Sequence, residues 1–273
     1  MSNQKTIITA AITGAVTRKE LNENVPYTPE EIAEDVYKCY KAGAAIAHIH
    51  MRNDAGEGTM SADRFEKTVK LIKEKCNIII NLTTSGDLNA TDETRQEHLI
   101  RLKPEMASFD AGSMNWQHKT VFLNTPEFLE KLGMTMQQNN VKPEIEVFDA
   151  GMIYNAQYYV KKGILNSPLH YQFVLGAAGG TTATVENLTY LKSLIPKDST
   201  WSAFGIGKGH LPILLATIAM GGHVRVGLED NIYYGKNVLA TNEDLVCRAA
   251  RIIKEAGNDV ATPDEARKIL GLK

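Results

Sequence analysis

The chain has 273 residues, of which 43% are hydrophobic and 23% are charged, and its formal net charge is -2. This balance is typical of a folded globular domain and argues against a disordered chain. The near-neutral charge argues against the clustered basic surface that nucleic-acid binding requires. The longest apolar run, residues 211–220, is too short to span a bilayer, and the first residues do not read as a signal peptide.

The cysteine content points to a reducing compartment. Cys39, Cys76 and Cys247 are scattered along the chain. An odd, unclustered set predicts neither a disulfide framework nor a thiolate metal site. We therefore expect a cytoplasmic protein that has no nucleic-acid or membrane partner.

Short apolar, β-branched runs alternate with longer amphipathic runs. Strands are predicted over residues 6–12, 45–51, 77–82, 106–110, 144–148, 170–175, 200–204 and 223–228. Helices are predicted to begin near Thr28, Ser61, Asp92, Thr125, Asn155, Thr184, His210 and Thr241, and a short C-terminal packing helix near Thr262. Several of these starts place a capping hydroxyl before a proline at the first helical position.

Eight consecutive strand–helix units define the expected fold. Several strands are apolar over most of their length, which is typical of parallel strands covered by helices. A closed (β/α)8 TIM barrel fits eight such units well, and an open doubly wound sheet is the competing arrangement. Because we find no linker or internal repeat, we expect a single domain over residues 1–273. In a barrel, the chemistry is expected at the carboxyl ends of the strands.

Two histidines, His48 and His50, stand at the end of the second predicted strand. Side chains alternate along a strand, so these two share a face about 6.6–7 Å apart and can converge on one divalent ion. Closure of the barrel brings the eighth strand near the second, and Glu229 lies at its carboxyl end. Two histidines and a glutamate are typical of a catalytic zinc site, although non-haem iron uses the same set. Packed or exposed histidines and a surface glutamate are the alternative interpretation.

Arg225 is predicted to share a face of the eighth strand with Glu229 and to point into the barrel. A buried guanidinium is costly unless it is paired, and Asp230 or Glu146 can supply the partner. Such a pair can tune a carboxylate for proton transfer, although a purely structural ion pair is equally consistent with the sequence.

A glycine-rich segment, Gly207, Lys208 and Gly209, opens the helix after the seventh strand. Barrels often hold phosphate at this position on backbone N–H groups and a helix N-terminus. The segment is therefore a candidate cofactor-binding site, with tight turns as the alternative explanation.

Seven motifs occur in order along the chain: TAAITGA, AHIHMR, LKPEMASFDAG, PEIEVFDAGM, PLHYQFVLG, GIGKGH and GGHVRVGLEDN. On these motifs the chain resembles, over essentially its whole length, the β-keto acid cleavage enzymes, a family that includes the 3-keto-5-aminohexanoate cleavage enzymes of lysine fermentation. The resemblance implies a zinc-bound TIM barrel that forms a homotetramer. It also implies that a β-keto acid and acetyl-CoA become acetoacetate and the CoA thioester of the shortened acid.

The resemblance also assigns expected roles to individual residues. It implies metal ligands at His48, His50 and Glu229, and catalytic roles for Asp230, Arg225, Glu146 and Thr83. Asp230 is the expected base, a role that Glu146 can share. The expected substrate contacts are Thr84, Ser85, Gly86, Ser108 and Val16.

Val16 departs from the family pattern, because members that act on the amino substrate carry a glutamate there. A buried ammonium facing valine would lack its counter-charge. We therefore expect a neutral or apolar β-keto side chain. Glu20 or Glu23 in the following loop can supply the counter-charge instead, so the amino substrate remains an alternative.

A TIM-barrel metal-dependent hydrolase is an alternative function, but the histidine pair of such enzymes typically lies on the first strand. A non-catalytic module that binds a metabolite or a metal is a second alternative function.

Overall fold

The computed structural model describes residues 4–272, in which eight parallel strands close into a barrel. Around the ring these strands are β2 (Ile8–Ala11), β3 (Ile46–Ile49), β6 (Ile79–Leu82), β7 (Met106–Asp110), β10 (Lys142–Val147), β11 (His170–Leu175), β12 (Thr200–Gly205) and β13 (His223–Val226). The ring closes where β13 pairs in parallel with β2, with Val224 opposite Ile8. The predicted (β/α)8 fold is confirmed, and the open sheet is excluded.

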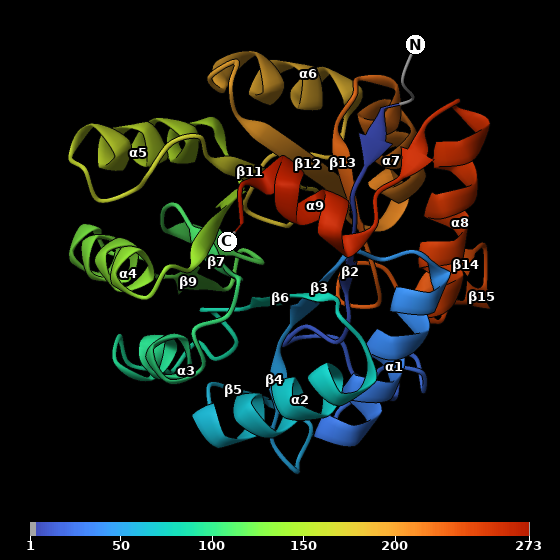
Figure 1. The fold of residues 1–273 in the computed structure, drawn as a ribbon, viewed down its shortest axis with the longest axis horizontal. Coiled ribbons are helices and arrows are strands. Elements are labelled where there is room, and N and C mark those ends of the chain that lie inside the picture. Colours follow the sequence, from blue (N-terminus) through green and yellow to red (C-terminus); the bar gives the residue numbers. More distant parts are fainter. Residues whose placement is uncertain (1–3, 273) are drawn as a thin grey trace.

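Helices surround the barrel (Figure 1). They are α1 (Pro29–Ala42), α2 (Ala62–Lys75), α3 (Thr94–Leu102), α4 (Pro126–Gln138), α5 (Ala150–Lys161), α6 (Val185–Leu194), α7 (His210–Ala219) and α8 (Asn242–Glu255). The capping signals act as predicted, since the Thr28 hydroxyl accepts from the backbone N–H of Glu31. The predicted start of α5 near Asn155 is wrong. Asp149 caps this helix by accepting from the N–H groups of Gly151 and Met152, so the helix begins five residues earlier.

The amino end of the barrel is covered by α9 (Pro263–Leu270), the predicted C-terminal packing helix. Ala266 and Leu270 pack against Ile46, Ile79 and Met106, which are buried at the bottom of the barrel. Nearby, β1 (Lys5–Thr6) pairs with β16 (Asp259–Val260). The first predicted strand, residues 6–12, is thus divided between β1 and β2.

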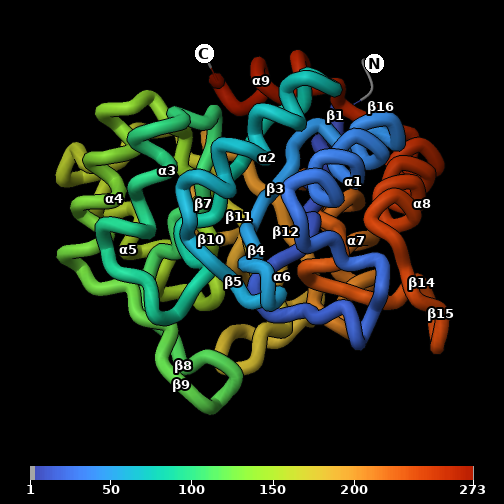
Figure 2. Tube along the Cα trace, turned by 90° about the horizontal axis from the view of Figure 1, so that it is seen from below, coloured from blue at the N-terminus to red at the C-terminus, as the bar shows by residue number. Residues whose placement is uncertain are grey.

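Three hairpins that the sequence did not predict follow barrel strands. They are β4 (Met51–Arg52) with β5 (Gly58–Thr59), β8 (Met114–Trp116) with β9 (Thr120–Phe122), and β14 (Tyr233–Gly235) with β15 (Val238–Leu239). Figure 2 shows them toward the end of the barrel away from α9, with β8 and β9 projecting farthest. Strands of two or three residues are too short for alternation to predict them. None of the helices within residues 4–272 has the length and apolar character needed to cross a membrane.

The lower barrel interior contains buried histidines in place of aliphatic side chains. His170 contacts the Thr200 hydroxyl at 2.9 Å and that of Ser202 at 3.3 Å, and Nδ1 of His223 accepts from the N–H of Ile7. Burial lowers the pKa of His170 to about 3 and that of His223 to about 4. These rings are therefore neutral in the folded protein at neutral pH.

We expect the free energy of unfolding to fall as the pH is lowered from about 6.5 toward 4. The unfolded chain binds a proton at each such histidine near its ordinary pKa, whereas the folded chain does not, so acid favours unfolding. At pH 5 the loss is about 2 kcal/mol for one histidine with the pKa of His170. Calorimetry at pH 7 and pH 5 should show that the free energy of unfolding falls less for His170→Gln than for the wild type. An unchanged loss would contradict this account, and His118→Gln, at an exposed histidine, is the matched control.

Candidate functional site

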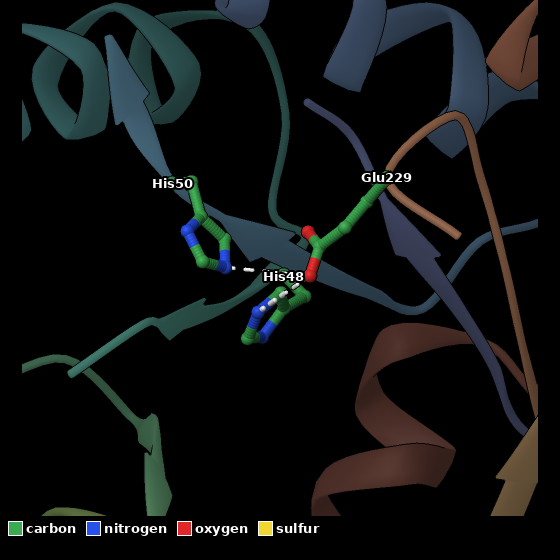
Figure 3. A group of neighbouring side chains, drawn as sticks. All are labelled: His48, His50 and Glu229. Carbon is green, nitrogen blue, oxygen red and sulfur yellow. Dashed lines mark ion pairs between the residues drawn. The ribbon is translucent and has the colours of Figure 1, made fainter. Parts of the chain in front are cut away.

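Two imidazoles and one carboxylate converge at the carboxyl end of the barrel, as Figure 3 shows. His48 lies on β3 and His50 follows directly after that strand. Oε1 of Glu229 lies 3.6 Å from Nε2 of His48 and 3.3 Å from Nε2 of His50. Ligand atoms around a tetrahedral zinc ion with bonds of 2.0–2.1 Å are about 3.4 Å apart. The donor types and their spacing therefore fit one divalent cation.

Two glycines let Glu229 approach the histidines from the far side of β2. A Cβ on Gly227, where φ is +152°, would lie 1.9 Å from the carbonyl oxygen of Ala11. A Cβ on Gly14, where φ is +59°, would lie 2.6 Å from Cγ of Glu229. Both positions require glycine, because the chain after β13 crosses directly over the end of β2.

Buried Arg52 organises the loop that faces Glu229. Its guanidinium donates to the carbonyl oxygens of Gly14 and Thr17, each at 2.6 Å, and to those of Thr13 and Gly56. Sequence reasoning missed this role, although the arginine ends the motif AHIHMR. Arg52 thus fixes the segment that carries Val16.

Arg225 joins three carboxylates inside the barrel. It donates to both oxygens of Asp230 at 2.9 and 3.0 Å, to Glu146 at 2.9 Å and to Glu229 at 2.6 Å. The guanidinium also lies over the ring of Phe204, with Cζ 4.5 Å from the ring centroid. Both partners that the sequence suggested for Arg225, Asp230 and Glu146, are therefore present.

The carboxyl groups of this network differ in their pKa values. Burial raises the pKa of Asp230 to about 6, although Arg225 opposes that effect. Burial also raises the pKa of Glu146 well above its usual range. Burial alone would raise the pKa of Glu229, but its interactions with His50 and Arg225 outweigh burial and hold that pKa well below its usual range. Glu229 is therefore charged at neutral pH, while Asp230 can take up and release a proton.

Glu144 is a second site residue that sequence reasoning missed. Its side chain is fully buried on β10, with Oε1 3.6 Å from Nδ1 of His48. Burial raises the pKa of Glu144, although the charge of Arg225 and a hydrogen bond with Asn81 oppose that effect. An outer carboxylate in this position orients a metal-binding imidazole. The signal lay in the motif PEIEVFDAGM, where alternation places Glu144 and Glu146 on one face.

A cavity of about 1760 Å³ opens above these groups. Predicted site residues that line it are Val16, His50, Ser85, Gly86, Glu146, Gly207, Lys208, Arg225, Glu229 and Asp230. It is also lined by Asp110, at the end of β7, which sequence reasoning did not single out although it stands in LKPEMASFDAG. The cavity is large enough for a substrate together with part of a larger co-substrate.

Of the hydroxyl side chains predicted to contact the substrate, only that of Ser85 reaches the cavity. The Thr83 hydroxyl lies 3.2 Å from that of Ser85, which reaches the cavity. Thr84 donates from its backbone N–H to the Ser108 hydroxyl and from its side chain to the Ser108 carbonyl oxygen, each at 3.0 Å. Thr83, Thr84 and Ser108 do not line the cavity, so their direct contact with substrate stays a prediction.

The predicted cofactor-binding segment forms a 3-10 turn, η1 (Gly207–Gly209), directly before α7. Gly207 and Lys208 line the cavity, but the Gly207 N–H already donates to Oδ1 of Asn231 at 2.7 Å. Gly209 does not line the cavity, and a Cβ there would lie 2.2 Å from that of Ala183. Close packing therefore explains Gly209, and only Gly207 and Lys208 of this segment face the cavity.

A closed (β/α)8 barrel with ionisable groups gathered at the carboxyl ends of its strands defines the class of barrel enzymes. Residues 5–272 match the β-keto acid cleavage enzyme family, and the chain belongs to that family. It is 46% identical to the 3-keto-5-aminohexanoate cleavage enzyme of Fusobacterium nucleatum, over 99% of both chains. It is 36% identical to the 3-oxoadipate:acetyl-CoA acetyltransferase of Cupriavidus necator, over 98% of this chain and 95% of the other.

The fold also occurs in a solved ternary complex of ObcA with a C4-CoA adduct and oxalate. The TM-score is 0.82 at 20% identity, over 91% of this chain and 68% of that chain. At this identity the likeness concerns the fold alone.

Proposed function

We propose that this protein converts a β-keto acid and acetyl-CoA into acetoacetate and the CoA thioester of the shortened acid. The observation that carries the proposal is one cavity that presents His50 and Glu229 beside Asp230, with Arg225 holding both carboxylates. Family membership and the acetyl-CoA-dependent relative support the same reaction.

His48, His50 and Glu229 would hold a divalent metal ion, which we propose to be zinc because of the two imidazoles and one carboxylate. When bound, the ion supplies Lewis-acid polarisation of the ketone and carboxylate oxygens of the keto acid. Glu144 would orient His48 through Nδ1.

Asp230 is the proposed base that removes a proton from the carbon between the two carbonyl groups. With a pKa of about 6 it is unprotonated at neutral pH yet basic enough to accept a proton. Arg225 fixes the carboxylate by its two hydrogen bonds, and Glu146 holds the other side of the guanidinium. Ser85 and Gly86 would position the keto acid, and the Thr83 hydroxyl would hold the Ser85 side chain in place.

The carbon nucleophile then forms a bond to the acetyl carbonyl carbon, and the CoA thiolate leaves. The thiolate adds to the ketone of the condensed acid, and cleavage of the adjacent carbon–carbon bond gives acyl-CoA and the acetoacetate carbanion. Asp230 returns the proton to this carbanion, and no oxidant is required. Gly207 and Lys208, at the cavity wall, are proposed contacts of the CoA moiety.

The family resemblance also implies a homotetramer and a cytoplasmic location, which we retain as proposals. Exposed apolar side chains on α7 and on β14–β15, such as Leu215, Tyr233 and Val238, are consistent with contacts between subunits.

The decisive experiment combines the metal-loaded protein with acetyl-CoA and a panel of neutral, cationic and anionic β-keto acids. We expect acetoacetate and the new acyl-CoA to form in equal amounts, measured by mass spectrometry. Omission of acetyl-CoA is the control and should stop all consumption of the keto acid. Consumption without acetyl-CoA would instead indicate hydrolysis, and no consumption with any acid would refute the proposal.

A further inference from the structure

Asn231 is a buried amide that directly follows the proposed base, Asp230, and that the reaction above leaves unused. Its exposed fraction is 8%, and it lines the cavity. The backbone N–H groups of Asp230 and Asn231 both donate to the carbonyl oxygen of Gly227, at 3.2 and 3.0 Å. The turn after β13 therefore fixes the place of Asn231 relative to Asp230.

The Asn231 side chain bridges residues 205–207, which form the turn between β12 and η1. Its Oδ1 accepts from the N–H of Gly207 at 2.7 Å, and its Nδ2 donates to the carbonyl oxygen of Gly205 at 2.9 Å. The space around Gly207 is open, because a Cβ built there would have no heavy atom within 4 Å among the described residues. Two hydrogen bonds from one amide therefore restrain a turn that side-chain packing at Gly207 does not.

His210 and Arg248 close off the other side of the amide. Nδ1 of His210 lies 3.0 Å from Nδ2 of Asn231, and its Nε2 lies 2.7 Å from Nη2 of Arg248 on α8. Burial, helped by the charge of Arg248, lowers the pKa of His210 to about 4, so the ring is uncharged at neutral pH and accepts from one of these donors. The two hydrogens of the Asn231 amide thus point at Gly205 and His210, and neither is left for a substrate.

The position of this turn matters for the proposed reaction. Gly207 and Lys208 line the cavity as proposed contacts of CoA, while Asp230 generates the carbon nucleophile that must reach the acetyl group. A displacement of about 1 Å between reacting groups can cost about 100-fold in rate. We propose that Asn231 is a positioning residue that holds the 205–207 turn, and with it acetyl-CoA, in place beside Asp230. This inference rests on the proposed function.

The test uses Asn231→Ala and separates the acetyl-CoA step from proton abstraction. We expect the KM for acetyl-CoA to rise by about 10- to 100-fold, and calorimetric binding of CoA to weaken by a similar factor. Proton abstraction is measured by NMR without acetyl-CoA, as exchange of the protons between the two carbonyl groups of the keto acid with deuterated water. This exchange should stay within about threefold of the wild-type rate, because Arg225 still holds Asp230.

Asn124→Ala is the matched control. Asn124 is 3% exposed, and its amide also bridges two partners, donating to the carbonyl oxygen of Gly112 at 3.1 Å and accepting from Arg95 at 2.6 Å. It does not line the cavity, and its hydrogen bonds lie away from the 205–207 turn. Its loss should lower the free energy of unfolding but leave the KM for acetyl-CoA unchanged.

The outcomes separate the two proposals. An unchanged KM for acetyl-CoA and an unchanged affinity for CoA would overturn the role of Asn231 and leave the proposed function intact. A loss of proton exchange as large as the rise in KM would also overturn it, because a merely structural residue would disturb both steps.

No turnover and no proton exchange in the wild type would overturn the proposed function, and CoA binding would then decide the role of Asn231 alone. If Asn231→Ala does not fold, Asn231→Ser takes its place, because the shorter serine side chain cannot span the backbone groups of Gly205 and Gly207. The same changes in KM and CoA affinity are expected for that variant.

Discussion

Substituting alanine for His50 is expected to remove the bound divalent metal ion and, with it, the proposed acetyl transfer. The His50 ring lies 3.3 Å from Glu229 and lines the cavity, so its loss leaves one imidazole and one carboxylate to hold the ion. Losing an outer partner of a ligand already costs about 10–100-fold in metal affinity, and loss of a ligand itself should exceed that. Elemental analysis after dialysis and competition with a chelator measure the effect directly. The same result is expected for His48→Ala.

The matched control for this experiment is His118→Ala, at an exposed histidine on the β8–β9 turn. It should keep the metal content and the affinity of the wild type. Full metal stoichiometry in His50→Ala and His48→Ala would show that these rings are not ligands.

Asp230→Asn is expected to keep the metal ion and the fold but to lose turnover. The amide can still accept one hydrogen bond from Arg225, but it cannot accept the proton of the keto acid. General base catalysis typically contributes 10²–10⁴-fold, so kcat should fall by about that factor. Single-turnover measurement of acetoacetate formation, with metal content determined in parallel, checks both halves of the expectation.

Asp87→Asn provides the comparison, because Asp87 also lines the cavity but is half-buried on the loop after β6. Its kcat should remain close to that of the wild type. Near-normal rates in Asp230→Asn would remove Asp230 as the base and leave Glu146 as the next candidate.

The proposed metal ligands His48, His50 and Glu229 show how far local sequence reasoning reaches. Alternation along one strand sufficed to place His48 and His50 on the same face, because that relation involves only adjacent residues. The approach of Glu229 could be proposed only by assuming that the barrel closes. The two positive φ angles at Gly14 and Gly227, which make the approach sterically possible, leave no periodic signal in the sequence.

Asp110 and Glu144 show where that reasoning stopped. Both stand in motifs that point to the family, yet nothing local shows which buried groups each carboxylate faces across the barrel. Their surroundings depend on the register of β7 with β10 and on where Arg225 and Arg95 direct their donors. The α5 start was missed for a different reason, since Asp149 caps that helix without the threonine–proline signal of α1 and α4.

By itself, the sequence determined the order of the strand–helix units, the family and the pair of histidines on one strand face. These depend on periodicity, capping residues and contiguous motifs, all of which are properties of neighbouring positions. Only the tertiary structure decided which carboxylates Arg225 joins, that Glu144 lies behind His48, and that Asp110 lies beside Glu146 at the cavity. Contacts between residues far apart in the chain follow from barrel closure and strand register, and those form only when the whole ring assembles.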